Sequence, residues 1–189
     1  MSAQDSKLFV ISGPSGAGKG TLVTRVRERR SNLGLTVSAT TRAPRKGEVD
    51  GVNYFFLTRE EFDRRVANGE FVEWAEVHGN CYGTLVSEVT SKLASGASLI
   101  LEIDVQGALQ VKERFPEAVL IFIKPPSLEV LRERLVGRGT ETPETIELRM
   151  ANAADELALA DRYDDVVVND DLDRATDEFV RVLDMHERN

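Results

Sequence analysis

The chain has 189 residues, with 24 basic and 32 acidic side chains and a formal net charge of −8. This length suits one α/β domain with small inserted lobes, and the acidic balance argues against nucleic acid or an anionic membrane as the main partner. No stretch approaches the about 18 apolar residues of a membrane span. Because Cys81 is the only cysteine, no internal disulfide can form, and we expect a cytoplasmic protein. We also expect a monomer or a small homo-oligomer.

Apolar runs rich in Val, Ile and Leu recur along the chain without polar alternation, which is typical of strands buried on both faces of a parallel sheet. They lie at 8–11, 35–38, 99–103, 119–123 and 166–168. Helical segments separate them, at 21–30, 87–94, 108–114, 127–136, 143–161 and 172–187. The sequence therefore predicts one α/β domain, a parallel sheet wrapped by helices.

A glycine-rich segment at 13–21 follows the first strand and opens the first helix. Its backbone N–H groups can turn toward one anion, and the helix N-terminus adds the positive end of its dipole. Lys19 can then reach the β- and γ-phosphates of a nucleoside triphosphate. The next residue is usually a Ser or Thr that ligates Mg²⁺, whereas here it is Gly20, so the protein ligands of the metal stay unassigned.

The segment 38–82 interrupts the alternation of strands and helices. It contains candidate antiparallel strands at 54–57 and 71–77, and Thr58 begins a short helix by a capping-box spacing. Gly69 ends that helix. We expect this segment to be an inserted lobe that binds a substrate.

A second inserted segment, 126–154, also lies where a strand hands over to a helix. Ligands of open α/β sheets bind outside the carboxyl ends of the strands, so this segment is a candidate lid. The core of the single domain would then consist of 1–37, 83–125 and 155–189.

Arginines gather in both inserted segments of this acidic chain. Arg42 and Arg45 flank a proline, and such a turn either binds a monoester phosphate through guanidinium donors or is a solvated charged loop. The second segment carries arginines that either reach a nucleotide or pair with Glu129, Glu133 and Glu147 on an exposed helix face. They are Arg132, Arg134, Arg138 and Arg149.

Three acidic residues suit specific tasks. Glu73 faces the opposite side of its strand from Trp74, and its two acceptors complement the N1–H and N2–H₂ donors of guanine but not adenine. An ordinary exposed carboxylate is the alternative. Glu102 and Asp104 end an apolar strand, where phosphate-loop proteins hold a carboxylate near Mg²⁺-bound phosphates. For Asp104 the alternative is a helix cap.

The ordered set of motifs resembles guanylate kinase over nearly the whole chain. After the phosphate loop it comprises Ser38-Ala-Thr-Thr-Arg-Ala-Pro-Arg45, Phe71-Val-Glu73-Trp74, Tyr82-Gly-Thr84, Ile103-Asp-Val-Gln-Gly107 and Val168-Asn-Asp-Asp171. The resemblance implies an enzyme of purine nucleotide metabolism that phosphorylates GMP to GDP with ATP and Mg²⁺, and that also accepts dGMP.

The same resemblance implies a set of site residues. GMP would be bound by Ser38, Arg42, Arg45, Tyr54, Glu73, Tyr82, Thr84 and Asp104. ATP would be bound by Ser15, Gly16, Ala17, Gly18, Lys19, Gly20, Thr21, Arg134, Arg138 and Asn169. The catalytic residues would be Lys19, Arg42, Arg138 and Arg149.

Three other functions share part of this pattern. Another nucleoside monophosphate kinase would share the phosphate loop and the lid, but an adenylate-type enzyme would have no reason to place Glu73 beside 82–84. A non-catalytic guanylate-kinase-like binding module would have lost a working ATP loop, whereas Lys19 and Arg149 are present here. A GTPase switch would need an Asn-Lys-x-Asp motif to read guanine, and the sequence has none.

Overall fold

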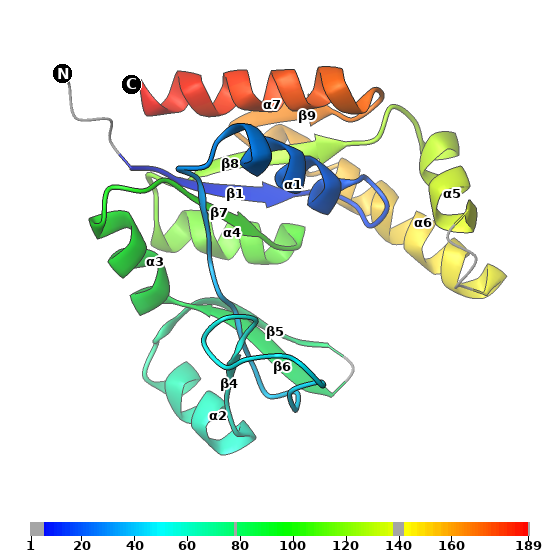
Figure 1. Cartoon of the computed structure of the whole chain (residues 1–189). Helices are drawn as coiled ribbons and strands as arrows, with labels where there is room; N and C mark the ends of the chain where they lie inside the picture. Colours follow the sequence, from blue (N-terminus) through cyan, green and yellow to red (C-terminus); the bar gives the residue numbers. More distant parts are fainter. Residues whose placement is uncertain (1–5, 78, 138–141, 189) are drawn as a thin grey trace.

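The structure of the protein is a computed structural model that describes residues 6–77, 79–137 and 142–188. Five parallel strands form its central sheet in the order β2-β7-β1-β8-β9. They are β1 (Leu8–Ser12), β2 (Gly34–Leu35), β7 (Leu99–Glu102), β8 (Val119–Lys124) and β9 (Asp165–Val168). Figure 1 labels β1, β7, β8 and β9. The predicted parallel sheet is confirmed.

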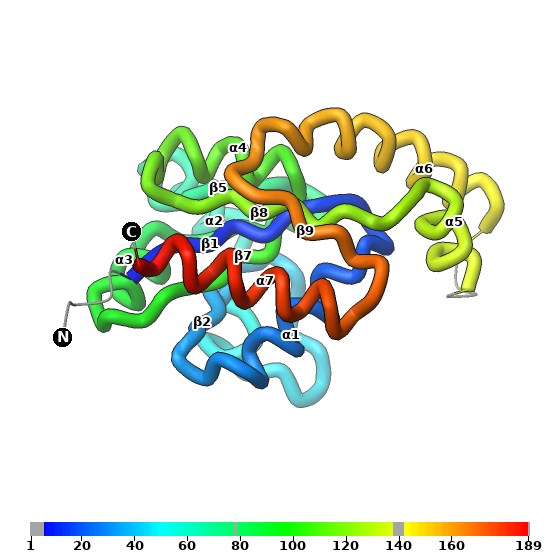
Figure 2. Tube along the Cα trace, turned by 90° about the horizontal axis from the view of Figure 1, so that it is seen from above, coloured from blue at the N-terminus to red at the C-terminus, as the bar shows by residue number. Residues whose placement is uncertain are grey.

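Helices cover both faces of this sheet (Figures 1 and 2). On one face, Phe9 and Ile11 of β1 pack in a cluster with α1 (Lys19–Arg29) and α7 (Leu172–Glu187). On the other, Leu8 and Val10 pack with α3 (Val86–Ala94) and α4 (Val105–Arg114). Successive residues of a strand point to opposite faces, which is why this strand is apolar throughout.

The strand predicted at 35–38 is wrong in extent, because β2 ends at Leu35. Beyond it, side chains of α3 replace the sheet ladder as partners of the backbone. Val37 N–H donates to Glu88 Oε1 at 2.8 Å, and Lys92 Nζ donates to Leu35 O at 2.8 Å. The chain is thereby led out of the central sheet and into a second one.

The second sheet has the strand order β4-β3-β6-β5. Its members are β3 (Ala39–Thr40), β4 (Phe55–Phe56), β5 (Phe71–Val77) and β6 (Asn80–Leu85). The antiparallel prediction is confirmed for β5, which pairs with β6, and wrong for β4, which pairs in parallel with β3. The parallel register follows from Phe55 N–H donating to Ser38 O and Leu57 N–H donating to Thr40 O, both at 2.9 Å.

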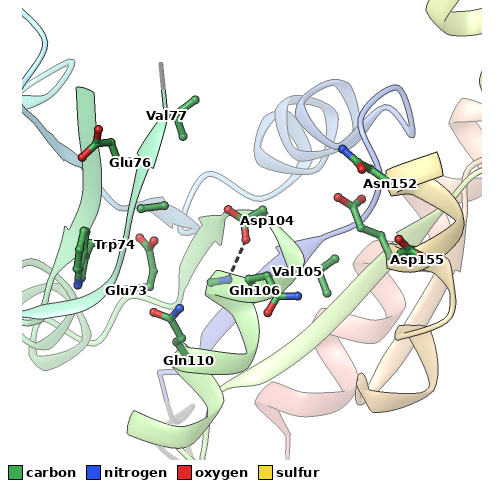
Figure 3. A pocket seen from close by; sticks show the side chains of 13 residues that line it. Glu73, Trp74, Glu76, Val77, Asp104, Val105, Gln106, Gln110, Asn152 and Asp155 are labelled. Atoms are coloured by element: carbon green, nitrogen blue, oxygen red, sulfur yellow. Dashed lines mark hydrogen bonds between the residues drawn. The ribbon is translucent and has the colours of Figure 1, made fainter. Parts of the chain in front are cut away.

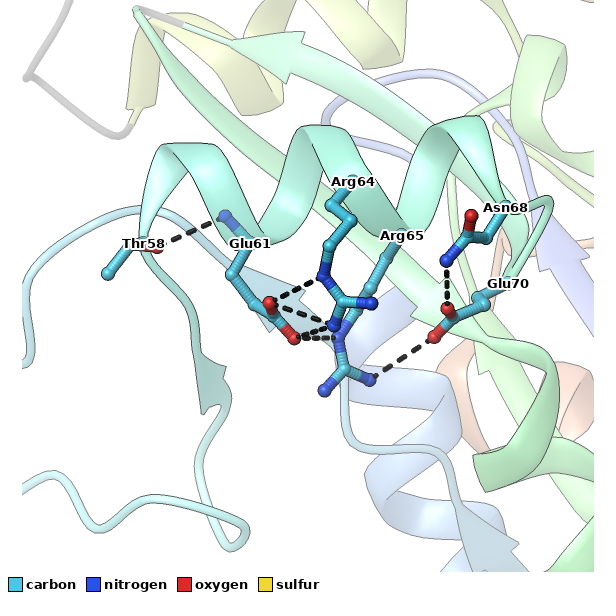
Figure 4. A network of polar contacts seen from close by, with 6 residues as sticks. All are labelled: Thr58, Glu61, Arg64, Arg65, Asn68 and Glu70. Carbon is cyan, nitrogen blue, oxygen red and sulfur yellow. Dashed lines mark hydrogen bonds and ion pairs between the residues drawn. The ribbon is translucent and has the colours of Figure 1, made fainter.

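Helix α2 (Arg59–Ala67) flanks the second sheet, and only half of its predicted capping box forms (Figure 4). Thr58 Oγ1 accepts a hydrogen bond from Glu61 N–H at 3.1 Å. The Glu61 carboxylate turns to Arg64 and Arg65 instead of returning to Thr58, and these hydrogen bonds lower its pKa to about 2.

Two helices form the second inserted segment at one end of the central sheet (Figure 1). They are α5 (Leu128–Gly137) and α6 (Pro143–Leu157), and they share a small apolar core of Leu131, Leu135 and Ala153. The helix predicted to reach 161 ends four residues earlier and is followed by a 3₁₀ turn, Ala160–Arg162. Leu159 and Ala160 pack against the central core there, so the chain bends toward it.

Candidate active site

The phosphate loop links β1 to α1 and has positive φ angles at Gly13, Gly16 and Gly18. Gly13 and Gly18 have φ angles of 141° and 88°, values that side-chain-bearing residues rarely adopt. A Cβ atom on Gly13 would lie 2.2 Å from Ile123 O, and one on Gly18 would lie 2.4 Å from Asn169 Nδ2. The backbone of the loop is therefore seated directly against β8 and Asn169.

Lys19 begins α1 and folds its ammonium group back over the loop. Nζ donates to Gly13 O at 2.5 Å and to Pro14 O at 3.1 Å. The Glu102 carboxylate at the end of β7 lies beside the same helix start, since a Cβ atom on Gly20 would be 3.7 Å from its Oε1. Burial raises the pKa of Glu102, and the charge of Lys19 lowers it.

A cavity of about 450 Å³ adjoins the loop on the side of α5. Its lining residues are Gly16, Gly18, Thr21, Arg134, Gly137, Asn169, Asp170 and Leu172. Arg134 Nη2 donates to Asn169 O at 2.8 Å, and Asn169 Nδ2 donates to Ala17 O at 2.8 Å. Residues predicted to bind ATP thus converge from three distant parts of the chain.

The predicted lid arginines differ in their surroundings. Arg149 Nη1 donates to Ser15 Oγ at 2.7 Å, which brings α6 onto the phosphate loop. Arg132 pairs with Glu147, with Nη2 and Oε2 3.0 Å apart, so the exposed-pair interpretation holds for this arginine. Arg138 lies outside the described residues.

In the second sheet, the structure brings Arg42, Tyr54 and Tyr82 together. The Arg42 guanidinium lies 5.4 Å from the centroid of the Tyr54 ring, and the Tyr54 and Tyr82 rings are 6.2 Å apart. Arg42 Nη2 donates to Glu48 Oε1 at 2.9 Å, which raises the pKa of the arginine and lowers that of the glutamate. Arg45 joins through its backbone N–H, 2.7 Å from Glu48 Oε2.

Glu48 organises the loop between β3 and β4, and its role was not predicted. Both its oxygens are used, because it bonds the side chain of one predicted phosphate-binding arginine and the backbone of the other. The available signal was an acidic residue six positions after Arg42 and directly after the turn glycine Gly47, whose φ angle is 90°.

Glu73 is only 8% exposed, so it is no ordinary surface carboxylate. Burial raises its pKa; the Thr84 hydroxyl opposite it in the strand pair offsets part of that shift, and the charge of Asp104 adds to it. Asp104 itself caps α4, with Oδ1 accepting from Gly107 N–H at 2.9 Å. The helix-cap alternative for Asp104 is therefore correct, and the cap also places this carboxylate near Glu73.

Glu73, Asp104 and Gly107 line a cavity of about 460 Å³ between β5, the start of α4 and helix α6 (Figure 3). Asn152 and Asp155 of α6 lie across this cavity from Glu73. Sequence reasoning missed both, although their spacing of three residues places them on one helix face. Ser38 is half-buried where the chain enters the second sheet, and its carbonyl accepts from Phe55 N–H.

A phosphate loop at the carboxyl end of a parallel sheet thus faces a second lobe that carries an arginine–tyrosine cluster and a buried carboxylate. This arrangement defines a nucleotide kinase of the phosphate-loop class. Among the described residues, no helix is long and apolar enough to cross a membrane. The same part of the chain contains no cluster of three or more His, Cys, Asp or Glu side chains that could hold a metal ion.

Comparison with known proteins defines the family. The family model "Guanylate kinase" matches residues 5–186. A guanylate kinase of Gloeobacter violaceus is 57% identical over 94% of this chain and 87% of its own length, and one of Halalkalibacterium halodurans is 52% identical over 97% and 90%. The crystal structure of guanylate kinase from Anaplasma phagocytophilum, 37% identical, superposes with a TM-score of 0.76 and covers 100% of this chain and 90% of that one. The chain belongs to the guanylate kinase family.

Proposed function

We propose that this chain transfers the γ-phosphoryl group of ATP to GMP and forms ADP and GDP, the reaction of its family. The observation that carries the proposal is the buried carboxylate of Glu73 in the cavity between β5, the start of α4 and helix α6. A buried acceptor without a matching donor is costly, so this cavity suits a ligand with paired N–H donors. Guanine offers them at N1 and N2, and adenine does not.

The acceptor base binds between β5, β6 and the start of α4. Glu73 accepts from the guanine N–H groups, Asp104 lines the same cavity, and Thr84 lies opposite Glu73 in the strand pair. We assign Ser38, where the chain enters the second sheet, to the same ligand. The Thr84 hydroxyl is fully buried with no hydrogen-bond partner among the described residues, although it lies close enough to Glu73 to affect its pKa. A base edge entering the cavity would supply that partner.

The phosphate of GMP binds to the arginine–tyrosine cluster of the lobe formed by residues 38–82. Arg42 and Arg45 supply guanidinium donors, and Tyr54 and Tyr82 supply hydroxyls beside them. Glu48 holds the Arg42 side chain and the backbone at Arg45, so the Arg42 guanidinium need not be ordered when the ligand arrives.

ATP binds at the phosphate loop of the central domain, away from the lobe that binds GMP. The amides of Ser15 to Thr21 surround its phosphates, Lys19 reaches the β- and γ-phosphates, and Arg134 and Asn169 border the adjoining cavity. Arg149 reaches the same phosphates from α6, and Arg138, in the lid segment, contributes a second lid cation.

We assign Mg²⁺ as the metal that accompanies ATP. Gly20 lacks the usual hydroxyl ligand, but the Glu102 carboxylate lies beside it and Thr21 follows, and hard oxygen donors of this kind fit Mg²⁺ and its bound waters. When bound, the metal would offset negative charge on the phosphates.

The chain's own residues act by positioning and charge. The GMP phosphate is already an oxyanion at neutral pH, so the transfer needs neither a covalent nucleophile nor a general base. Lys19, Arg42 and the lid arginines stabilise the charge that spreads over the transferring phosphoryl group. Closure of the lobe over the core holds the two phosphates in line and excludes water that would hydrolyse ATP.

For the organisation of the chain, we propose 38–82 as the GMP-binding lobe and 126–154 as the lid, on a core of 1–37, 83–125 and 155–189. The second sheet runs on to Leu85, three residues past the proposed lobe boundary. We further propose a cytoplasmic monomer or small homo-oligomer, without nucleic-acid or membrane partners and with dGMP as a second acceptor.

Calorimetric titration of GMP into the wild type and Glu73→Gln tests the proposal. The amide keeps one acceptor but adds a donor that opposes the guanine donors, so GMP affinity should fall about 30-fold or more. Glu60→Gln in the same lobe is the matched control, since that side chain is exposed on α2 and does not line the cavity. Equal GMP affinity in wild type and Glu73→Gln would contradict the assignment.

A further inference from the structure

Strand β5 contains an irregularity just before Glu73. Phe71 pairs with Leu85 whereas Glu73 pairs with Thr84, so two steps along β5 match one step along β6. This is a β-bulge, a feature that re-aims side chains. Its effect is visible at Gly83, where an added Cβ atom would lie 2.8 Å from both Phe71 Cδ1 and Trp74 Cβ. Phe71 and Trp74, three residues apart, therefore share one side of the sheet.

The bulge decides where Glu73 points. In a regular strand, Phe71 and Glu73 would share a face, and the carboxylate would enter the apolar cluster in which Phe71 stacks on Phe62. Instead, Phe71 packs in the lobe, Val72 packs in the central core, and Glu73 faces the cavity. Glu73 reaches the position proposed for guanine recognition because of this β-bulge.

An arginine from the central core holds the bulged end of the strand. Arg114, the last residue of α4, donates from Nη1 to Phe71 O at 2.7 Å and from Nη2 to Gly69 O. The carbonyl between them, Glu70 O, accepts from Val86 N–H at 2.9 Å. Three successive carbonyls at the start of β5 are thus fixed, two of them by a charged donor, which makes the stronger kind of hydrogen bond.

Helix α4 therefore contacts the base-reading strand at both of its ends. Its first turn brings Asp104 and Gly107 beside Glu73, and its last residue holds Phe71, two positions before Glu73. Arg114 does not line the cavity. We infer that Arg114 is a positioning residue for base selection, which keeps the bulge docked on the core and Glu73 turned into the cavity. This inference rests on the proposed function, which gives Glu73 its role.

The test compares binding of GMP and IMP by calorimetry in Arg114→Ala, Arg114→Lys and Lys112→Ala. IMP lacks the 2-amino group, so the ratio of the two dissociation constants reports how well the carboxylate meets the guanine edge. Lys112 is the matched control, because it lies on α4 but bonds Ala118 O and Asp164 on the core side. Arg114→Ala should lower the preference for GMP by about five- to tenfold, Arg114→Lys less, and Lys112→Ala not at all.

A structural role alone would give a different result. If Arg114→Ala weakens GMP and IMP equally, or lowers only the thermal midpoint, the inference is overturned, and Arg114→Lys extends the test should the alanine variant fold poorly. Glu73→Gln measured alongside separates the two claims. If it loses the GMP preference and Arg114→Ala retains it, only the inference about Arg114 fails, whereas an unchanged preference in Glu73→Gln removes the proposed role of Glu73 as well.

Discussion

Arg149 on helix α6 donates a hydrogen bond to Ser15 Oγ in the phosphate loop at 2.7 Å, across 134 positions of sequence. The fold therefore brings a cation of α6 to the phosphate loop, where we propose that the phosphates of ATP bind. A cation at that position can act on charge that develops as the phosphoryl group transfers.

We predict that Arg149→Ala lowers kcat by about 100-fold and raises the KM for either substrate much less, because the lost interaction is strongest in the transition state. Steady-state kinetics with both substrates varied checks this. Arg132→Ala, which removes an arginine paired with Glu147 on the exposed side of the lid, should behave like the wild type. An unchanged kcat in Arg149→Ala would remove this residue from the transition state.

Lys19→Met should lower kcat by about 100- to 1,000-fold while leaving the fold intact, since the ammonium group is the cation held at the mouth of the phosphate loop. The matched control is Lys124→Met, an exposed lysine at the end of the neighbouring strand β8. Turnover and far-ultraviolet circular dichroism should be measured together. Comparable turnover in the two lysine variants would argue against the proposed role of the loop.

Glu48→Gln should raise the KM for GMP by about three- to tenfold and change the KM for ATP little, because the charged hydrogen bonds that hold Arg42 and the Arg45 backbone are weakened. Glu60→Gln, on the exposed side of the same lobe, serves as the control. A lower KM for GMP would mean that Glu48 competes with the GMP phosphate for Arg42 and does not orient it.

Glu61 should make the stability of the protein depend on pH in the acid range. Its hydrogen bonds to Arg64 and Arg65 lower its pKa from 4.5 to about 2, so the stabilisation is present above about pH 4.5 and is lost as pH falls through the folded-state value. Thermal midpoints of wild type and Glu61→Gln should differ at pH 6 and converge toward about pH 2. A difference that stays constant over this range would show that the carboxylate charge does not matter.

The sequence was most informative where structure is local. The apolar runs predicted the strands of the central sheet, and the glycine-rich segment predicted the turn between β1 and α1. Thr58 and Asp104 cap their helices within a few residues of chain. In each case the residues that determine the structure are neighbours in the sequence.

Prediction failed where side chains that are distant in the sequence determine where a strand ends or which strand it pairs with. The strand at 35–38 ends early because Glu88 and Lys92 take over its hydrogen bonds. Strand β6 was not predicted because its central Gly83 is typical of a strand break, yet here a side chain at 83 would collide with Phe71 and Trp74. The tasks of Glu48 and Arg114 likewise exist only once the lobe is folded.

The most direct test of the account is ADP release in a coupled assay with Mg·ATP and, in turn, GMP, dGMP, AMP, CMP and UMP as acceptors. We predict strong turnover with GMP, weaker turnover with dGMP and negligible turnover with AMP. Preference for AMP would contradict guanine reading by Glu73, and binding of GMP without turnover of any acceptor would contradict the proposed catalytic activity.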